Sequence, residues 1–200
     1  MKLNWADRWF VNSPIRVIQQ RWEIGWIKDK GGAGPGNVIL EVGCGRGAGA
    51  RIILREFTPS VFHSLDLDIR MIQKARKYLS PQEREKISLY VGDVFRLPYR
   101  NDCLDVVFAF GVLHHIPDWQ GALHEIARVL KPGGLYFFEE IYPSIYQNFL
   151  TKHILLHPRE NRFYSRDLKA ALKHCKLHLK DALEFEKVNI VGISVKERGP

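Results

Sequence analysis

A glycine-rich segment, residues 40–47 with the sequence LEVGCGRG, follows a short apolar run. Glycines at such a turn let the backbone pass close beneath a ligand, and a following helix points its N-terminal N–H groups at the same place. Gly43, Gly45 and Ala48 also satisfy the spacing GxGxxA, which is typical of dinucleotide-binding turns. The segment therefore indicates a nucleotide-type cofactor, and the glycine pattern alone does not say which one.

Acidic residues after the next two apolar runs could hold the nucleoside of that cofactor. Asp66 stands nineteen residues after Gly47, and an acid about 20 residues after the turn is expected to bind the ribose hydroxyls. Asp68 is the alternative, although a helix cap suits it better. Asp93, after the third run, could accept the exocyclic amine of adenine.

The elements that must position these residues alternate along the chain. We expect helices over 48–57 and 69–79 and after Asp118, and strands over 37–42, 61–67, 87–91, 104–110 and 135–140. This alternation predicts a parallel sheet with helices on both faces. Two further strands, 177–185 and 188–195, have no helix between them and should pair as an antiparallel hairpin.

The first 36 residues follow a different pattern. Ser13-Pro14 is a good helix start, and Gly31-Gly32 with the GPG segment 34–36 should end the helix and form a hinge. Between them, spacings of three, four and four predict one apolar stripe, made of Ile15, Ile18, Trp22 and Trp26. We expect this stripe to pack on a core, and a ligand-binding role is the alternative. We therefore divide the chain into a helical arm with its hinge, 1–36, and an α/β domain, 37–200.

The net charge of +8 lies in the two flanks. Residues 1–36 hold six Lys/Arg and three Asp/Glu, residues 37–142 hold thirteen of each, and residues 143–200 hold eleven and six. A basic flank could attract an anionic partner, rest on a membrane surface or simply solvate helix faces.

Length and composition limit the remaining possibilities. Two hundred residues fit one decorated domain, and the longest uncharged stretch, 106–117, is too short to cross a bilayer of about 30 Å. The first ten residues contain charges and no apolar run, so we expect no signal peptide. Three widely spaced cysteines, Cys44, Cys103 and Cys175, favour a reducing, cytoplasmic setting.

Four segments, EVGCGRG, LDLD, GDVFRLPYRNDCLDVVFAFGVLHHIPD and EIARVLKPGG, resemble in their order the motifs of class I S-adenosylmethionine-dependent methyltransferases. The resemblance covers roughly residues 37–142 and is greatest to the small ubiquinone/menaquinone-type enzymes with a type 11 domain. It implies a Rossmann-like, doubly wound, seven-stranded sheet that is mostly parallel, with the last strand antiparallel. Arg46, where a small residue is common, and Cys175-Lys176, where Gly-Phe is common, depart from the pattern.

The resemblance also implies which residues bind S-adenosylmethionine and its product, S-adenosylhomocysteine. It places Glu41, the glycines of the turn and Phe110 around the methionine end. Asp66 would hold the ribose, and residues after the second and third strands would hold the adenine. This cofactor-binding set comprises Glu41, Gly43, Cys44, Gly45, Asp66, Leu67, Asp93, Val94 and Phe110.

The reaction expected with this cofactor is an in-line displacement that needs nucleophile and methyl aligned at about 3–3.5 Å. A base is needed only if the acceptor must lose a proton. The candidates, all at carboxyl ends of strands, are His114, His115, Glu140 and Tyr142. Glu139 and Glu140 should point to opposite faces, so only one of them can face the site. The histidines match no metal-ligand spacing, and we expect no metal.

The connection 141–164 is long for a compact domain and rich in aromatic residues and arginines. With the arm, which contains Trp5, Trp9 and Phe10, it could form a lid over a small-molecule or lipid-like acceptor that bears negative charge. No Asp/Asn-Pro-Pro-aromatic stretch follows the fourth strand and no Pro-Cys dipeptide is present, which argues against base-amine and cytosine C5 chemistry.

Other functions stay open from the residues alone. Methylation of RNA is one alternative, suggested by the charge, although we expect no stable nucleic-acid partner. A nicotinamide-dependent oxidoreductase is a second, suggested by GxGxxA, although 200 residues leave little room for a substrate domain. We expect no transmembrane segment, and peripheral membrane contact through the basic flanks is a further hypothesis.

Overall fold

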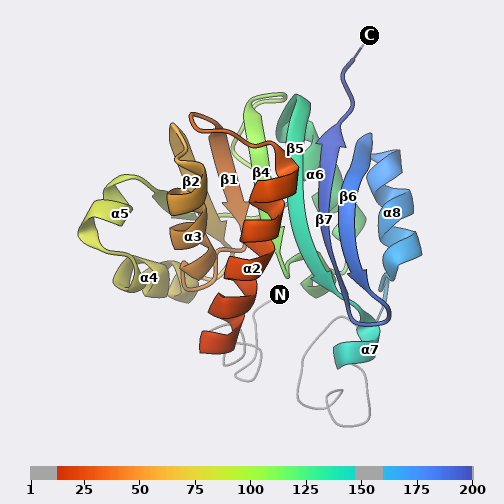
Figure 1. Ribbon diagram of the computed structural model, residues 1–200, viewed down its shortest axis with the longest axis horizontal. Coiled ribbons are helices and arrows are strands. Elements are labelled where there is room, and N and C mark those ends of the chain that lie inside the picture. Colours follow the sequence, from red (N-terminus) through yellow and green to blue (C-terminus); the bar gives the residue numbers. More distant parts are fainter. Residues whose placement is uncertain (1–12, 147–159, 200) are drawn as a thin grey trace.

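The computed structural model describes residues 13–146 and 160–199, in which seven strands form one sheet with helices on both faces (Figure 1). The strand order is β3-β2-β1-β4-β5-β7-β6. In chain order the elements are α2 (Pro14–Gly31), β1 (Val38–Val42), α3 (Ala48–Phe57), β2 (Val61–Asp66), α4 (Ile69–Tyr78), α5 (Pro81–Glu85), β3 (Ser88–Val91), β4 (Leu104–Phe110), the 3₁₀ helix η1 (Leu113–His115), α6 (Trp119–Val129), β5 (Leu130–Ile141), α7 (Pro143–Tyr146), α8 (Ser165–His174), β6 (Leu177–Phe185) and β7 (Asn189–Lys196).

The strand directions confirm the doubly wound, Rossmann-like sheet predicted from the alternation of elements. Strands β1 to β5 pair in parallel. The hairpin is also confirmed, and β7 lies between β5 and β6, antiparallel to both. The sequence order reverses direction between β1 and β4, so the crevice at their carboxyl ends is where an open α/β sheet binds its ligand.

Side chains alternate along each strand and divide the core into two layers. In the first layer, Ile39, Phe108 and Phe137 pack against α2 and α3, which contribute Ile27 and Phe57. Residues of odd number in β1 and β5 therefore face α2 and α3.

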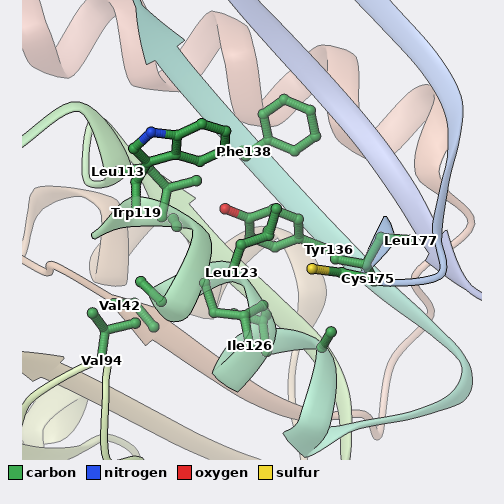
Figure 2. Close-up of a cluster of buried hydrophobic side chains, with 14 of the residues drawn as sticks. Val42, Val94, Leu113, Trp119, Leu123, Ile126, Tyr136, Phe138, Cys175 and Leu177 are labelled. Carbon is green, nitrogen blue, oxygen red and sulfur yellow. The ribbon is translucent and has the colours of Figure 1, made fainter. Parts of the chain in front are cut away.

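The second layer lies on the opposite face, under α6 and α8. Figure 2 shows Leu123 and Ile126 of α6 beside Tyr136 and Phe138 of β5, with Cys175 joining from the end of α8. Residues of even number in β5 face this layer, so neighbouring residues at the end of β5 lie on different faces.

The apolar stripe predicted for α2 is wrong for three of its four residues. Ile15 and Ile18 are each 69% exposed and Trp22 is 52% exposed, whereas the half-buried Trp26 packs against the first layer. The residues of α2 that enter the core are Ile24 and Ile27, which are fully buried.

Contacts at both ends of α2 explain why its buried face differs from the predicted one. Near its end, a Cβ on Gly31 would lie 2.7 Å from the Phe137 ring, so the helix axis approaches the sheet closely along the Gly31 side. Near its start, the buried Arg16 forms an ion pair with Glu139 of β5. The ion pair at the start of α2 and the close approach at its end therefore determine which face of the helix points toward the sheet. Among the described helices, none is long and apolar enough to span a membrane.

Candidate active site

The glycine-rich turn connects β1 to α3 and crosses the end of β2. The N–H groups of Gly43 and Cys44 both donate to the Leu65 carbonyl at 2.9 Å. The three glycines of the turn have positive φ angles of 74°, 51° and 86°, at Gly43, Gly45 and Gly47. This conformation favours glycine, and the turn therefore presents backbone without side chains at the carboxyl end of β1.

Asp66 ends β2 and faces this turn. Its Oδ2 accepts the Gly45 N–H at 2.9 Å, and its Oδ1 accepts the Asp68 N–H at 2.9 Å. Burial raises the pKa of Asp66 above its usual value, while the two backbone N–H groups act in the opposite direction. Each carboxylate oxygen has two lone pairs, so each keeps one that can accept a hydroxyl.

The neighbours of Asp66 have different surroundings. Asp68 caps α4, because its Oδ1 accepts the Arg70 N–H at 3.0 Å and its Oδ2 lies 2.7 Å from the Arg70 guanidinium. Leu67 is 51% exposed beside the turn. The arrangement gives Asp68 the structural role that the sequence favoured and leaves Asp66 as the carboxylate at the turn.

Residues after β3 lie next to the end of β2. The Gly92 N–H donates to the Asp66 carbonyl at 3.1 Å. Asp93 is exposed and its Oδ1 accepts the Phe95 N–H at 3.0 Å, whereas Val94 is buried in the second layer. Asp66 and Asp93 therefore stand at adjacent strand ends, as a shared adenosine requires.

Two buried groups of the turn region carry raised pKa values. Glu41 accepts the Ser64 hydroxyl at 2.6 Å, and burial raises its pKa to about 7, with the Asp66 charge adding to the shift. A Cβ on Gly49 would collide with Glu41 Oε1, so this carboxyl lies against the first turn of α3. Burial also raises the pKa of the Cys44 thiol, which makes it a poor nucleophile.

The loop after β4 lies directly against the glycine-rich turn. β4 ends at the buried Phe110, and the Gly111 N–H donates to the Glu139 carbonyl at 2.7 Å. A Cβ on Gly43 would lie 2.6 Å from Val112 Cγ2. The carboxyl ends of β1 and β4 therefore hold two loops in contact, the glycine-rich turn and the loop that follows Phe110.

Glu140, fully buried on the second-layer face, holds the loop after β4. Its Oε1 accepts the N–H groups of Val112 at 3.3 Å and Leu113 at 2.9 Å, and its Oε2 accepts the His114 N–H at 3.1 Å. The same Oε2 lies 2.6 Å from His114 Nδ1. Because an ionised carboxylate only accepts hydrogen bonds, Nδ1 is the nitrogen of His114 that donates to Glu140.

The remaining predicted base residues lie in two places. His115 is half-buried, and its ring centroid is 4.3 Å from that of His114. Tyr142 is buried, and its hydroxyl donates to Glu184 Oε1 of β6 at 3.0 Å; burial raises its pKa. The structure therefore brings His114, His115 and Glu140 together and gives Tyr142 a contact toward β6. The catalytic role of each stays a prediction.

The sequence analysis missed a group of charged residues on the other face of β5. Arg16 of α2 lies 2.9 Å from Glu139 Oε2 and 3.5 Å from Glu23 Oε1. All three are buried. Arg16 and Glu23 are seven residues apart and so share one face of a helix, and this spacing was the available signal.

Comparisons with known proteins agree with this geometry. A family model described as a methyltransferase domain, of the type 11 kind, matches residues 40–138. The sterol 24-C-methyltransferase of Schizosaccharomyces pombe is 34% identical over 124 residues, which cover 61% of this chain and 32% of that protein. The fatty-acid O-methyltransferase of Mycolicibacterium smegmatis is 34% identical over 108 residues, which cover 54% of this chain and 38% of that protein. The matched part of the chain thus spans about a third of the length of these relatives.

The fold has solved counterparts along nearly its whole length. A SAM-dependent methyltransferase from Aquifex aeolicus superposes with a TM-score of 0.76 at 15% identity, covering 97% of this chain and 99% of that one. The strand order, the glycine-rich turn with its facing carboxylate and the family match lead to one assignment. The chain belongs to the class I S-adenosylmethionine-dependent methyltransferases, of the type 11 kind.

Proposed function

We propose that this protein transfers a methyl group from S-adenosylmethionine to a small-molecule or lipid-like acceptor. One observation carries the proposal: the Asp66 carboxylate accepts the Gly45 N–H at 2.9 Å, at the carboxyl ends of the paired strands β1 and β2. A ribose held there would direct the rest of the cofactor into the crevice between β1 and β4, where ligands of open α/β sheets bind.

The residues of this crevice fit the cofactor. Asp66 would accept the ribose hydroxyls and Asp93 the adenine amine, while Glu41 would face the amino-acid end. Of the apolar residues predicted for the cofactor, Leu67 is exposed, whereas Val94 and Phe110 are buried in the second and first core layers. When bound, S-adenosylmethionine supplies an electrophilic methyl on a positively charged sulfur, and the task of the chain is to hold an acceptor in line with it.

His114 is our candidate for accepting a proton from the acceptor. Its Nδ1 donates to Glu140 at 2.6 Å, and this contact fixes the orientation of the imidazole ring that would take the proton. Glu140 then acts as a positioning residue, because all its contacts hold the His114 loop and ring. A thiol, hydroxyl or carbon acid would need this proton transfer, and a neutral amine would not need it before methylation.

Apolar side chains around the site support a lipid-like acceptor. With the exception of Val61, the exposed large hydrophobic residues of the described chain lie on the start of α2, the strand ends and loops at the carboxyl edge, α7, the start of α8 and the β6–β7 turn. They include Ile18, Trp22, Leu67, Phe95, Ile145 and Val188. We expect this apolar rim to contact a lipid surface or a poorly soluble acceptor. The names of the two relatives above, a sterol and a fatty-acid methyltransferase, favour the same class.

The lid predicted over 141–164 stays a prediction. Residues 147–159 of the connection lie outside the described residues, and so do residues 1–12 of the arm, which contain Trp5, Trp9 and Phe10. The described ends of the connection include Tyr146, whose ring centroid is 5.9 Å from that of His114, and Phe163, which packs on Trp119 at 4.5 Å. The near end of the connection therefore reaches the predicted base.

Two measurements test the proposal. We expect the purified chain to bind S-adenosylhomocysteine in a calorimetric titration and to bind NADH much more weakly. With tritiated S-adenosylmethionine and a cell extract, label should enter the organic-solvent fraction of lipids and small molecules. Binding of NADH alone would favour the oxidoreductase alternative, and label confined to RNA would favour the nucleic-acid alternative.

A further inference from the structure

A seam of charged side chains runs between α2 and the first-layer face of the sheet. It contains three buried carboxyl groups, Glu23, Glu41 and Glu139, which are 1%, 2% and 1% exposed. Arg16, 7% exposed, is the cation that contacts Glu23 and Glu139. With all groups ionised, the seam has an excess of two negative charges, which is costly to bury.

One oxygen of the seam has no hydrogen-bond partner among the described residues. Glu23 Oε1 accepts the Gln19 amide at 2.7 Å and lies 3.5 Å from Arg16, but Glu23 Oε2 is buried without a donor. Burial raises the pKa of Glu23, and the neighbouring Glu139 carboxylate raises it further. A buried carboxylate oxygen without a donor is unfavourable unless a ligand or a water molecule supplies one, or the carboxyl group itself carries a proton.

Through Glu139 and Arg16, the seam reaches the loop that follows β4 at the carboxyl edge of the sheet. A Cβ on Gly111, the residue that follows β4, would be 3.5 Å from Glu139 Oε2 and 3.7 Å from the Arg16 guanidinium. The same point is 3.5 Å from His114 Cε1. The seam and the Glu140–His114 pair therefore meet at Gly111, from the two faces of the sheet.

We propose that Glu23 and Glu139 form a binding site for an ammonium group of a ligand in the crevice. An ammonium has three N–H donors and one positive charge, so it would supply the missing donor at Glu23 Oε2 and reduce the negative excess of the seam. An anionic group is disfavoured at this position by the same excess. The proposal rests on the proposed function, and the ammonium comes either from the amino-acid end of the cofactor or from an amine on the acceptor.

The test compares the intact chain with Glu23→Gln, which keeps the side-chain shape and removes the charge. Calorimetry measures the affinity for S-adenosylhomocysteine and for methylthioadenosine, which lacks the amino-acid end. Calorimetry also measures the affinity for octylamine and for its neutral counterpart octanol, both in the presence of S-adenosylhomocysteine. The matched control is Glu56→Gln, because Glu56 is an exposed acid of α3 that pairs with Lys28 of α2 at 2.8 Å.

Either of two results supports the proposal. If the cofactor supplies the ammonium, Glu23→Gln weakens S-adenosylhomocysteine at least about tenfold and leaves methylthioadenosine unchanged. If the acceptor supplies the ammonium, Glu23→Gln binds S-adenosylhomocysteine and octanol with unchanged affinity, and its affinity for octylamine falls. Unchanged binding of all four probes overturns the proposal and makes Glu23 a neutral structural acid.

Two further checks keep the outcomes separate. Should thermal melting show that Glu23→Gln does not fold, Glu139→Gln removes the second carboxylate of the same site and must give the same selective loss. An intact chain that fails to bind S-adenosylhomocysteine contradicts the proposed function instead, whatever the variants do.

Discussion

The guanidinium of Arg16 lies 2.9 Å from Glu139 Oε2, although 123 residues separate the two in the chain. This contact joins the first turn of α2 to the carboxyl end of β5, and both groups are buried. The ion pair with Glu139 also keeps the pKa of Arg16 above its usual value despite its burial. The start of α2 therefore lies at the carboxyl edge of the sheet, and Arg16 points toward the sheet, where Glu139 is its partner.

We predict that Asp66→Ala weakens S-adenosylhomocysteine binding by about ten- to a hundredfold, because a charged hydrogen-bond acceptor for the ribose is lost. Calorimetric titration measures the change. Asp68→Asn is the matched control, since it alters the neighbouring carboxylate that caps α4 and should leave the affinity within about threefold. Equal affinity in Asp66→Ala, with a loss in Asp68→Asn, would transfer the ribose role to Asp68.

For Asp93 we predict a loss that depends on the adenine amine. Asp93→Ala should weaken S-adenosylhomocysteine by about tenfold and should have little effect on S-inosylhomocysteine, which has no exocyclic amine. Competition binding with the two nucleosides measures both affinities. A similar loss for both ligands would mean that Asp93 acts through its hydrogen bond to the Phe95 N–H, by shaping the loop.

The Glu140 contacts predict a large effect on stability. Glu140→Ala would leave the N–H groups of Val112, Leu113 and His114 without their acceptor, and the free energy of unfolding should fall by at least about 3 kcal/mol. Urea denaturation measures the change, with Glu186→Ala, an exposed change in the β6–β7 turn, as a control. A fall below about 1 kcal/mol would show that water replaces the carboxylate at little cost.

Stability should also depend on pH through Glu41. Its pKa is 4.5 ordinarily and about 7 in the folded chain, so between these values the folded state holds a proton that the unfolded state has lost. The free energy of unfolding should therefore fall as pH rises from 4.5 to about 7, by about 3 kcal/mol for this group. Glu23, with its raised pKa, contributes in the same direction.

Urea denaturation across this pH range measures the dependence. Glu41→Gln cannot ionise and should show a distinctly smaller fall, whereas Glu85→Gln on the exposed surface of α5 should behave like the unaltered chain. Parallel curves for the unaltered chain and Glu41→Gln would mean that the pKa of Glu41 is the same in the folded and unfolded states.

The sheet could be predicted from the sequence because each strand is a short apolar run of consecutive residues. The strand over 104–110 and the helix over 48–57 have the predicted bounds. In the strand, residues 106–110 are a continuous apolar run, as expected of a strand that is buried on both faces. β5 was predicted too short: it starts at Leu130, which pairs with Leu104, although Pro132-Gly133-Gly134 is typical of a turn. Pairing across the sheet decides that boundary.

The site was predictable in part for the same reason. The spacing from the glycine-rich turn to Asp66 identified the carboxylate that accepts the Gly45 N–H. The contact between Glu140 and the N–H groups of residues 112–114 could not be predicted, because 26 to 28 residues separate Glu140 from these partners. The buried face of α2 could not be predicted from the spacing of residues within 14–31. It depends on contacts with Glu139 and Phe137, which belong to β5.

The orientation of α2 gives the final prediction, with two isoleucines on one helix as a matched pair. Ile18 is 69% exposed and Ile27 is fully buried in the first layer. Ile27→Ala should lower the free energy of unfolding by about 2–5 kcal/mol, whereas Ile18→Ala should change it by less than about 0.5 kcal/mol. Ile18→Ala should instead weaken binding to neutral phospholipid vesicles in a flotation assay, because Ile18 belongs to the apolar rim. A larger loss of stability in Ile18→Ala than in Ile27→Ala would contradict this orientation. It would mean that Ile15, Ile18 and Trp22 pack on the core and that Arg16 does not point toward the sheet.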